Sequence, residues 1–301
     1  MQEVKDIPKI KARDRDSHKT NFGRLFVLAG SQGMLGAACL CTQACMRSGA
    51  GLVTLGIPAS LQPYAAIKLT SAMTKGFAET PEHTLSDTGL DAILEFAEKQ
   101  DVVALGPGLS QHPNTQQLVQ RLVPFISKPL VIDADGLNAL AKQPNLLEQR
   151  KALTIVTPHP GEFIRIYKMG QESNLQPETL SKHRITYAGS FAREFHCVVV
   201  LKYARTIVTD GELYYINTTG NPGMANGGSG DVLTGVIAAL VGQHFSGWEA
   251  AQIGVWAHGY AGDLVAQELG EMGMLAEDVV LRLPLAFRAL QQPLPTPRQE
   301  V

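Results

Sequence analysis

The sequence predicts an α/β fold in which a mostly parallel central sheet lies between two layers of helices. Apolar strands alternate along the chain with amphipathic helices, and the turns between them contain Gly, Asp or Pro. The strands are continuous apolar runs, which indicates burial on both faces and therefore a parallel sheet covered by helices. At 301 residues, with 45% hydrophobic and 18% charged residues, the chain can bury the large core that this fold requires.

Each element follows from an apolar run and from the turn residues that end it. In chain order we expect a strand at 25–29, a helix at 36–48, strands at 52–57 and 102–105, a helix at 114–126, a strand at 130–133, a short helix at 136–141 and a strand at 153–157. Helices at 161–167 and 177–195 and a strand at 198–201 follow. The alternation continues without a dividing linker or internal repeat, so we expect one domain over residues 1–301.

The last third of the chain departs from this alternation. Two short strand-like runs within residues 206–217 flank Asp210-Gly211, a strong hairpin signal, so this segment is predicted to form an antiparallel edge. From Ser229 onward the chain is mostly helical, and the helix at 248–269 has apolar surface for core packing or for another subunit. Residues 1–18 are charged and residues 291–301 are proline-rich, so both are expected to be loose tails.

Composition narrows the class of partner. A net charge of −2 without blocks of like charge offers no general attraction to nucleic acid or to anionic membranes, so the expected partner is a small molecule. The N-terminus lacks the apolar core of a signal peptide, and no apolar run approaches membrane-spanning length. The four cysteines lack metal-ligand spacing, which predicts free, buried or half-buried thiols in a reducing cytoplasm: Cys39, Cys41, Cys45 and Cys197.

The most informative segment is residues 221–240, NPGMANGGSGDVLTGVIAAL. Its glycines remove side chains where the backbone approaches a ligand, and the helix that follows supplies unpaired N–H groups and a positive dipole end, which together favour an anion. Asp231 beside bound phosphates would be unfavourable unless it handles a proton or a metal ion. The segment therefore predicts phosphoryl transfer.

Other loops follow the strands of the same predicted sheet. Gly30-Ser31-Gln32-Gly33 resembles a nucleotide loop but lacks the GxGxxG fingerprint, so a tight turn explains it equally. The helix after it opens with small residues around Ala37, which would let a ligand lie against the backbone. Gly106-Pro107-Gly108, residues 133–138 (DADGLN) and residues 157–162 (TPHPGE) end three further strands, and such loops face one crevice at the edge of a parallel sheet.

Several charged side chains in these loops have more than one interpretation. Glu162 is either a carboxylate that complements a helix N-terminus or a magnesium ligand through water, and His159 is a turn residue or a binding residue. Lys202 ends a buried strand, where its charge must reach solvent or an anion, so phosphate contact is favoured. Asp133 and Asp135 could hold magnesium or cap the helix at 136–141, and capping is slightly favoured.

From about Lys19 to about Pro284 the chain resembles a known family. The ordered motifs GRLFVLAGS, GAACL, RSGAGLVTL, ALGPGLS, LVIDADGLNAL, TPHPGEF, VVVLKYARTIV and NPGMANGGSGDVLTGVIAAL are similar to those of the ADP/ATP-dependent NAD(P)H-hydrate dehydratases of the ribokinase-like superfamily. The resemblance implies a ribokinase-like three-layer sandwich and a cytoplasmic repair enzyme. Such enzymes phosphorylate the hydroxyl of the S form of hydrated NADH or NADPH, using ADP or ATP with Mg²⁺, and phosphate then leaves as the ring double bond re-forms.

The resemblance also implies roles for individual residues. Asp231 would be the general base, and the amides of Gly228, Ser229 and Gly230 would stabilise charge on the transferring phosphate. Glu162 would organise magnesium through water. The nucleotide would contact Gly230 and the segment Lys202, Tyr203, Ala204, Arg205 and Thr206. The hydrated dinucleotide would contact Ala37, Gly106, Gly108, His159, Asn221 and Asp231.

Two residues depart from the family pattern: Tyr203 and Thr20 stand where glycine is usual, and Tyr203 replaces close backbone approach near the nucleotide with an aromatic contact. GGSGD with KxART resembles the bacterial branch, which favours ADP over ATP. The resemblance further implies a homotetramer, with any NAD(P)H-hydrate epimerase acting as a separate chain. Alternatives are a small-alcohol or vitamin kinase of the same fold, similar to hydroxyethylthiazole kinase, and a non-catalytic dinucleotide-binding protein.

Overall fold

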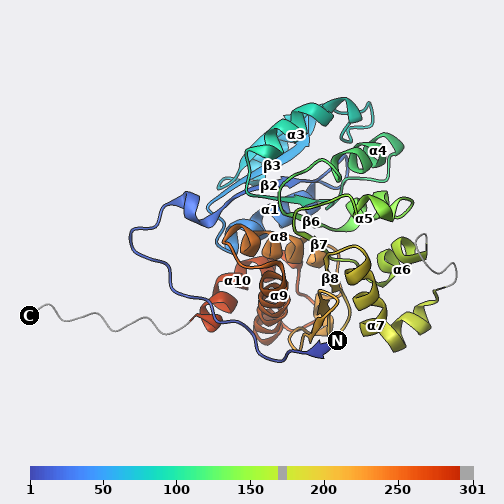
Figure 1. Ribbon diagram of the computed structural model, residues 1–301. Coiled ribbons are helices and arrows are strands. Elements are labelled where there is room, and N and C mark those ends of the chain that lie inside the picture. The colour runs from blue at the N-terminus through green and yellow to red at the C-terminus, as the bar shows by residue number, and fades with distance from the viewer. Residues whose placement is uncertain (169–174, 292–301) are drawn as a thin grey trace, which may run out of the picture.

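A computed structural model describes residues 1–168 and 175–291 (Figure 1). Its strands form one ten-stranded sheet in the order β1-β10-β9-β8-β7-β6-β5-β2-β3-β4. The strands are β1 (Gln2–Glu3), β2 (Arg24–Leu28), β3 (Leu52–Pro58), β4 (Met73–Phe77), β5 (Val102–Leu105), β6 (Leu130–Ile132), β7 (Thr154–Val156), β8 (Val198–Leu201), β9 (Ile207–Thr209) and β10 (Leu213–Ile216). Every neighbouring pair from β4 to β8 is parallel, and only β9 runs against its neighbours.

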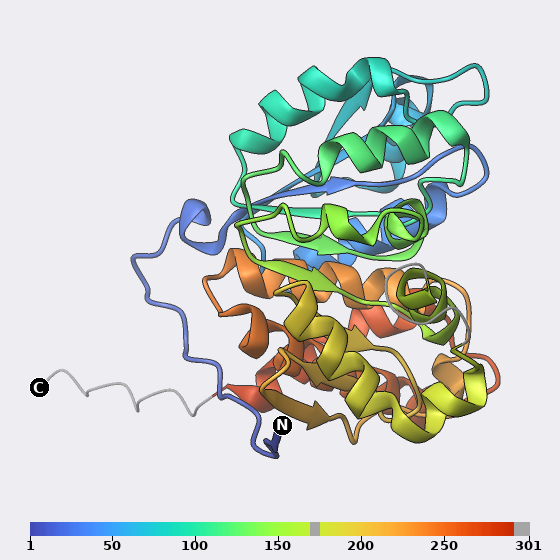
Figure 2. The same cartoon turned by 45° about the vertical axis from the view of Figure 1, so that its right-hand side comes forward.

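Helices cover both faces of the sheet, which confirms the predicted three-layer arrangement (Figures 1 and 2). One face packs against α1 (Leu35–Arg47), α2 (Gln62–Lys68), α8 (Ser229–Gly242), α9 (Gly247–Leu269) and α10 (Ala276–Leu290). The other packs against α3 (Leu90–Glu98), α4 (Pro113–Leu122), α5 (Ala134–Leu140), α6 (Pro160–Lys168) and α7 (Pro177–Glu194). Alternation along β2 divides the core: Leu25 and Val27 point to the first layer, whereas Phe26 and Leu28 point to the second.

The strand order reverses between β2 and β5. From β2 the chain adds β3 and β4 on one side, and then returns to place β5 on the other side of β2. At such a switch point the two following loops diverge and leave a crevice outside the carboxyl ends of the strands. The loops that begin at Gly30 and Gly106 therefore border the crevice that the fold provides for a ligand.

Most predicted elements match the structure to within a few residues, and the hairpin of β9 and β10 is confirmed. Two features differ from expectation. The hairpin is not the last element of the sheet, because β1 pairs with β10 outside it. Between β3 and β5 the structure contains α2, β4 and α3, a region for which the sequence predicts no element; β4 reads MTKGF and lies at the sheet edge, so it lacks the apolar run of a central strand.

The N-terminal segment is bound to the protein, in contrast to the expected loose tail of residues 1–18. Besides the pairing of β1, Ile10 forms a parallel bridge with Gln291, and the Arg13 guanidinium donates to the Gly49 carbonyl and lies 3.6 Å above the Phe22 ring centroid. The charged composition of residues 1–18 did not indicate these contacts, because they are made by backbone groups and by a single cation, Arg13. Of the expected C-terminal tail, residues 292–301 lie outside the described residues.

The sequence left open whether the apolar surface of the helix at 248–269 packs in the core or against another subunit. In the structure this helix is α9, and its apolar side chains pack in the core. Its buried side chains belong to the core on one face of the sheet, alongside those of α8 and α10. All four cysteines are free and buried, as the sequence predicts. Within residues 1–168 and 175–291, each helix is either too short or too polar to cross a lipid bilayer.

Close packing of α1 against α8 generates a test of the fold. A Cβ atom added at Gly235 of α8 would lie 2.2 Å from the Cys41 carbonyl oxygen of α1, which is backbone and has little freedom to move. We expect Gly235→Ala to lower the free energy of unfolding by about 1–3 kcal/mol through overpacking. Urea denaturation measures this change. The matched control is Gly36→Ala in α1, where no atom lies within 4 Å; it should instead add about 0.5–1 kcal/mol through helix propensity. Equal effects of both changes would contradict the packing argument.

Candidate active site

The residues of the predicted site lie together at the carboxyl edge of the sheet, because β6, β7 and β8 are parallel and end on the same side. Asp133 follows β6, His159 lies just after β7 and Lys202 follows β8. The N-terminus of α8 reaches the same place: a Cβ atom at Gly230 would lie 3.1 Å from the Lys202 ammonium and 3.8 Å from an Asp133 carboxylate oxygen.

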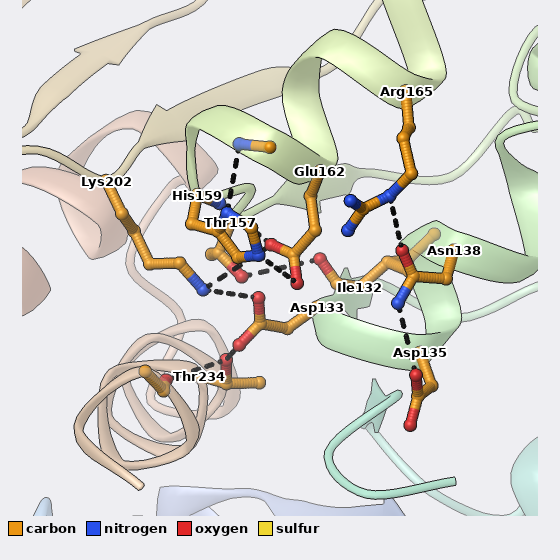
Figure 3. A network of polar contacts seen from close by, with 12 residues as sticks. Ile132, Asp133, Asp135, Asn138, Thr157, His159, Glu162, Arg165, Lys202 and Thr234 are labelled. Atoms are coloured by element: carbon orange, nitrogen blue, oxygen red, sulfur yellow. Dashed lines mark hydrogen bonds and ion pairs between the residues drawn. The ribbon is translucent and has the colours of Figure 1, made fainter. Parts of the chain in front are cut away.

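An ion pair lies at the centre of this cluster (Figure 3). The Lys202 Nζ atom donates to Asp133 Oδ1 at 2.7 Å, and Thr234 of α8 donates to Asp133 Oδ2 at 2.7 Å. Asp133 is 1% exposed, so its charge depends on these partners. Asp133 occupies the N-cap position of α5 but makes no cap hydrogen bond, so the capping role slightly favoured from sequence is wrong: the carboxylate points away from α5 and joins β6, β8 and α8.

Glu162 and His159 form a second pair beside the first. The Glu162 carboxylate accepts the His159 backbone N–H at 2.8 Å and lies 3.3 Å from His159 Nε2 and 4.0 Å from Lys202 Nζ. The Gly161 N–H donates to His159 Nδ1 at 3.0 Å, so this histidine shapes the turn into α6. Burial raises the pKa of Glu162, with Lys202 opposing that effect. Glu162 thus fills the helix N-terminal role while its carboxylate remains close to the ion pair.

The glycine turn before α8 has the backbone geometry that only glycine tolerates well. Gly228 occupies the N-cap of α8 with φ of 95°, and a Cβ atom there would lie 2.6 Å from Leu40 Cδ1. No side chain of the turn caps the helix, so backbone N–H groups at its start remain available to an anion. The expected anion cradle is therefore compatible with the structure.

Asp231 lies in the first turn of α8 and has no hydrogen bond or ion pair within residues 1–168 and 175–291. Burial raises the pKa of Asp231 to about 7, the nearby charge of Asp133 adds to this effect, and Lys202 opposes it. A carboxyl group that titrates near neutrality accepts and releases protons efficiently at that pH. The arrangement can therefore perform general base chemistry on a group bound at the helix N-terminus.

The β5 loop forms the wall of the crevice next to α1. Gly106 has φ of 132°, and a Cβ atom there would lie 1.8 Å from the Asp133 carbonyl oxygen. A Cβ atom at Gly108 would lie 2.8 Å from the Met34 carbonyl oxygen and 3.1 Å from Ala37 Cβ. The Ser31 hydroxyl donates to the Gly108 carbonyl at 2.8 Å, which connects the loop after β2 to the loop after β5. Three predicted substrate residues, Ala37, Gly106 and Gly108, are thus neighbours.

Asp135 belongs to a separate series of hydrogen bonds, which does not include Asp133. Its carboxylate accepts the Ser110 N–H at 2.9 Å and the Asn138 amide at 3.1 Å, and Asn138 in turn accepts from Arg165 at 3.0 Å (Figure 3). These bonds connect the β5 loop to α5 and α6. Asp135 therefore supports the shape of the crevice, and a metal ion is not needed to explain its position.

The segment after β8 that is predicted to contact the nucleotide is a tight turn with an aromatic side chain, Tyr203. Thr206 donates to the Tyr203 carbonyl at 3.1 Å, and Arg205 has φ of 65°. The Arg184 guanidinium of α7 lies 5.3 Å from the Tyr203 ring centroid and donates to the Ala204 carbonyl at 3.3 Å. The side chain that replaces the usual glycine thus lies against a cation, which forms a platform suited to an aromatic ring or a phosphate.

Asn221 lies apart from the ion pair. Its side chain accepts the Gly223 N–H and donates to Asp263 of α9 at 3.0 Å, so the structure ties this residue to α9. Sequence reasoning missed Asp263, and it also missed Thr234 and Arg184. Thr234 could have been found from helical spacing, because it follows Gly230 by four residues on an otherwise apolar helix.

The carboxylates of the site could bind Mg²⁺ only together with water molecules and the phosphates of a nucleotide. No group of three or more His, Cys, Asp or Glu side chains suited to a metal occurs among the residues described. Mg²⁺ retains several waters and is commonly held by one or two carboxylates together with substrate phosphates. Glu162, which is 6% exposed and lies beside the anion cradle, has the required chemistry.

Comparison with known proteins identifies the family of this chain. A family model for NAD(P)H-hydrate dehydratases matches residues 25–285. A bifunctional NAD(P)H-hydrate repair enzyme of Moorella thermoacetica is 42% identical over 286 residues, which are 94% of this chain and 53% of that protein. A similar enzyme of Thermofilum pendens is 37% identical over 292 residues, 96% of this chain and 54% of that protein. The chain thus spans about half the length of the curated relatives it matches.

Solved structures agree. The ADP/ATP-dependent NAD(P)H-hydrate dehydratase of Bacillus subtilis, co-crystallised with ATP and Mg²⁺, has a TM-score of 0.79 and 31% identity, covering 94% of this chain and 95% of that chain. A ribokinase-like superfamily protein of Enterococcus faecalis has a TM-score of 0.79 and 26% identity, covering 95% and 93%. With the three-layer sheet and the glycine turn in place, these matches show that the chain belongs to the NAD(P)H-hydrate dehydratase family and has the ribokinase-like fold.

Proposed function

We propose that this protein dehydrates the S form of NADH hydrate or NADPH hydrate, using ADP or ATP as the phosphoryl donor. The observation that carries the proposal is the position of Asp231: a half-buried carboxyl group that makes no hydrogen bond or ion pair within the described residues, with a pKa raised to about 7 by desolvation and by Asp133, at a helix N-terminus suited to phosphate. Family membership supplies the substrate class.

In the first step Asp231 takes the proton of the ring hydroxyl while the hydroxyl oxygen attacks the terminal phosphorus of the nucleotide. The bond from that phosphorus to its bridging oxygen breaks, and AMP leaves from ADP, or ADP from ATP. The backbone N–H groups of Gly228, Ser229 and Gly230 would stabilise the negative charge of the transferring group. In the second step phosphate leaves with the electrons of the C–O bond, the adjacent ring carbon gives up a proton, and the double bond of the reduced nicotinamide re-forms.

The nucleotide would lie along the segment from Lys202 to Thr206, where the Lys202 side chain is 19% exposed and its ammonium is close to Gly230. Lys202 would contact a phosphate, and Tyr203 with Arg184 would face the rest of the nucleotide. Bound Mg²⁺, held by Glu162 through water, would neutralise phosphate charge. The bacterial type of GGSGD and KxART motifs favours ADP as the donor.

The hydrated dinucleotide would occupy the opposite side of the crevice, against the wall formed by Ala37, Gly106 and Gly108. The absence of side chains at the two glycines and the single methyl group of Ala37 allow a ligand to approach the backbone there. His159, held by the turn into α6, and Asn221, held by α9, would complete the contacts.

We also propose a cytoplasmic homotetramer that works together with an NAD(P)H-hydrate epimerase. Support for self-association comes from large apolar side chains exposed on α2 and α10, including Ile67 at 79% and Leu281 at 50%. The two helices lie next to each other, because Lys68 and Glu277 form an ion pair of 3.3 Å between them.

The proposal predicts that ADP with hydrated NADH restores the absorbance band of NADH in the presence of the protein. Asp231→Asn should lower the rate by about 10²-fold or more, because the hydroxyl proton loses its acceptor. Calorimetry should find ADP binding largely unchanged. An activity of the variant within a few-fold of wild type would show that Asp231 is not the base. Phosphorylation of a thiazole or pyrimidine alcohol without recovery of NADH would instead favour a kinase.

The raised pKa of Asp231 predicts how stability depends on pH. The folded protein holds this proton up to about pH 7, whereas the unfolded chain releases it near the ordinary pKa of an aspartate, 3.8. The folded state therefore binds more protons between these values, and its stability falls as the pH rises through them. Asp231→Asn removes this penalty, so its stability relative to wild type should increase between pH 5 and pH 8 in urea denaturation. A constant difference would contradict the raised pKa.

Lys202→Ala should weaken ADP binding by about tenfold or more while hydrated NADH binding changes little, because the ammonium faces the phosphate side of the crevice. Calorimetry with each ligand measures the two affinities, and Lys151→Ala on the exposed surface is the control. Since Asp133 would lose its cation, the double change Lys202→Ala with Asp133→Asn should show the same selective loss. Equal weakening of both ligands would overturn the assignment of Lys202 to the nucleotide.

A further inference from the structure

A buried histidine lies directly behind the anion cradle. His258, in the middle of α9, is 8% exposed, and its Nε2 atom is 3.4 Å from the hydroxyl oxygen of Ser229. Ser229 is the first residue of α8, is also 8% exposed, and lies between Gly228 and Gly230. The contact therefore joins α9 to the part of α8 whose backbone faces the transferring phosphate.

The ring of His258 is neutral at physiological pH. Burial lowers the pKa of His258 to about 4; the Ser229 backbone opposes this change and the charge of Lys202 adds to it. A neutral imidazole has a single N–H, so the atom that faces Ser229 either donates or accepts. The contact between Nε2 and the Ser229 hydroxyl fits both roles, and the tautomer of the ring decides between them.

The surrounding contacts show that α9 holds the whole segment before α8. Thr219 donates to the Trp256 carbonyl at 2.9 Å, and the Asn217 amide donates to the Val255 carbonyl at 3.1 Å. Asp263 accepts the Gly220 N–H at 2.9 Å. Among these α9 residues, His258 contacts Ser229, the first residue of α8, where the phosphate would lie.

We propose that His258 is a positioning residue for phosphoryl transfer: it donates from Nε2 to Ser229, so that the Ser229 hydroxyl proton stays free for an oxygen of the transferring phosphate. The inference rests on the proposed function and extends it by one residue. Were Nε2 the acceptor, the Ser229 hydroxyl would donate to the ring and would be unavailable to the phosphate. The protonated nitrogen of His258 thus decides which way the serine hydroxyl points.

A double-mutant cycle tests the inference. Ser229→Ala should lower kcat by about 10²-fold, the usual loss for one donor to a developing negative charge. His258→Leu, which keeps the volume but removes the donor, should lower kcat by about tenfold with the KM for ADP within a few-fold of wild type. The double variant should be no slower than Ser229→Ala alone, because His258 acts through that hydroxyl. Multiplying losses would overturn the inference.

Two further variants separate positioning from packing. His258→Gln places an amide nitrogen close to the position of Nε2 and should recover most of the lost kcat. Gln252→Leu, also on α9, replaces a buried polar residue that donates to the Asp6 carbonyl far from the cradle, and should leave kcat unchanged. Thermal melts establish that each variant is folded. If His258→Gln is as slow as His258→Leu, or Gln252→Leu is equally slow, packing of α9 explains the effect and the inference fails.

Nuclear magnetic resonance of the wild-type protein with ¹⁵N-labelled histidine gives a test that does not depend on turnover. The chemical shifts of His258, assigned by its loss in His258→Gln, should show a proton on Nε2, both alone and with ADP and inorganic phosphate. A proton on Nδ1 would overturn the inference even in an active enzyme. Failure of the wild type to restore NADH would instead refute the proposed function, and the tautomer would still be decided.

Discussion

The structure of the site depends on one buried ion pair. Asp133 at the end of β6 binds the Lys202 ammonium at the end of β8, and Thr234 brings α8 to the same carboxylate. A carboxylate that is 1% exposed is costly without such partners, so the three elements are held in a fixed relation. Two further candidate residues lie beside this pair: Glu162 is 4.0 Å from the ammonium, and Gly230 is next to it.

The pair also affects the pKa of Asp231, the proposed proton acceptor. Desolvation is the main cause that raises this pKa; the negative charge of Asp133 raises it further, and the positive charge of Lys202 limits the rise. The same lysine is available to a phosphate because its ammonium has more donors than Asp133 uses. The charges of Asp133 and Lys202 therefore hold the elements of the site together and also take part in its proposed chemistry.

Glycine residues provide the second constraint, since they let separate backbones meet at the crevice. Gly106 contacts the Asp133 backbone, Gly108 contacts the start of α1, and Gly228 turns the chain into α8 with a positive φ. A side chain at any of these positions would collide with backbone or with a packed neighbour. Behind them, α9 holds the glycine turn through Asp263 and His258. These contacts support the glycine turn from the side of α9.

The sequence by itself determined the three-layer α/β fold, the free buried cysteines, the hairpin, and the family, because apolar runs and ordered glycine motifs are local signals. It also gave Asp231, Lys202 and Glu162 as candidate site residues, whose roles remain proposals. Only the tertiary structure decided what Asp133 does, because its partners Lys202 and Thr234 are distant in sequence and no local pattern joins them. It likewise attached the N-terminal segment to the sheet and revealed His258, since a single polar residue in an apolar helix gains meaning only from the residue it faces.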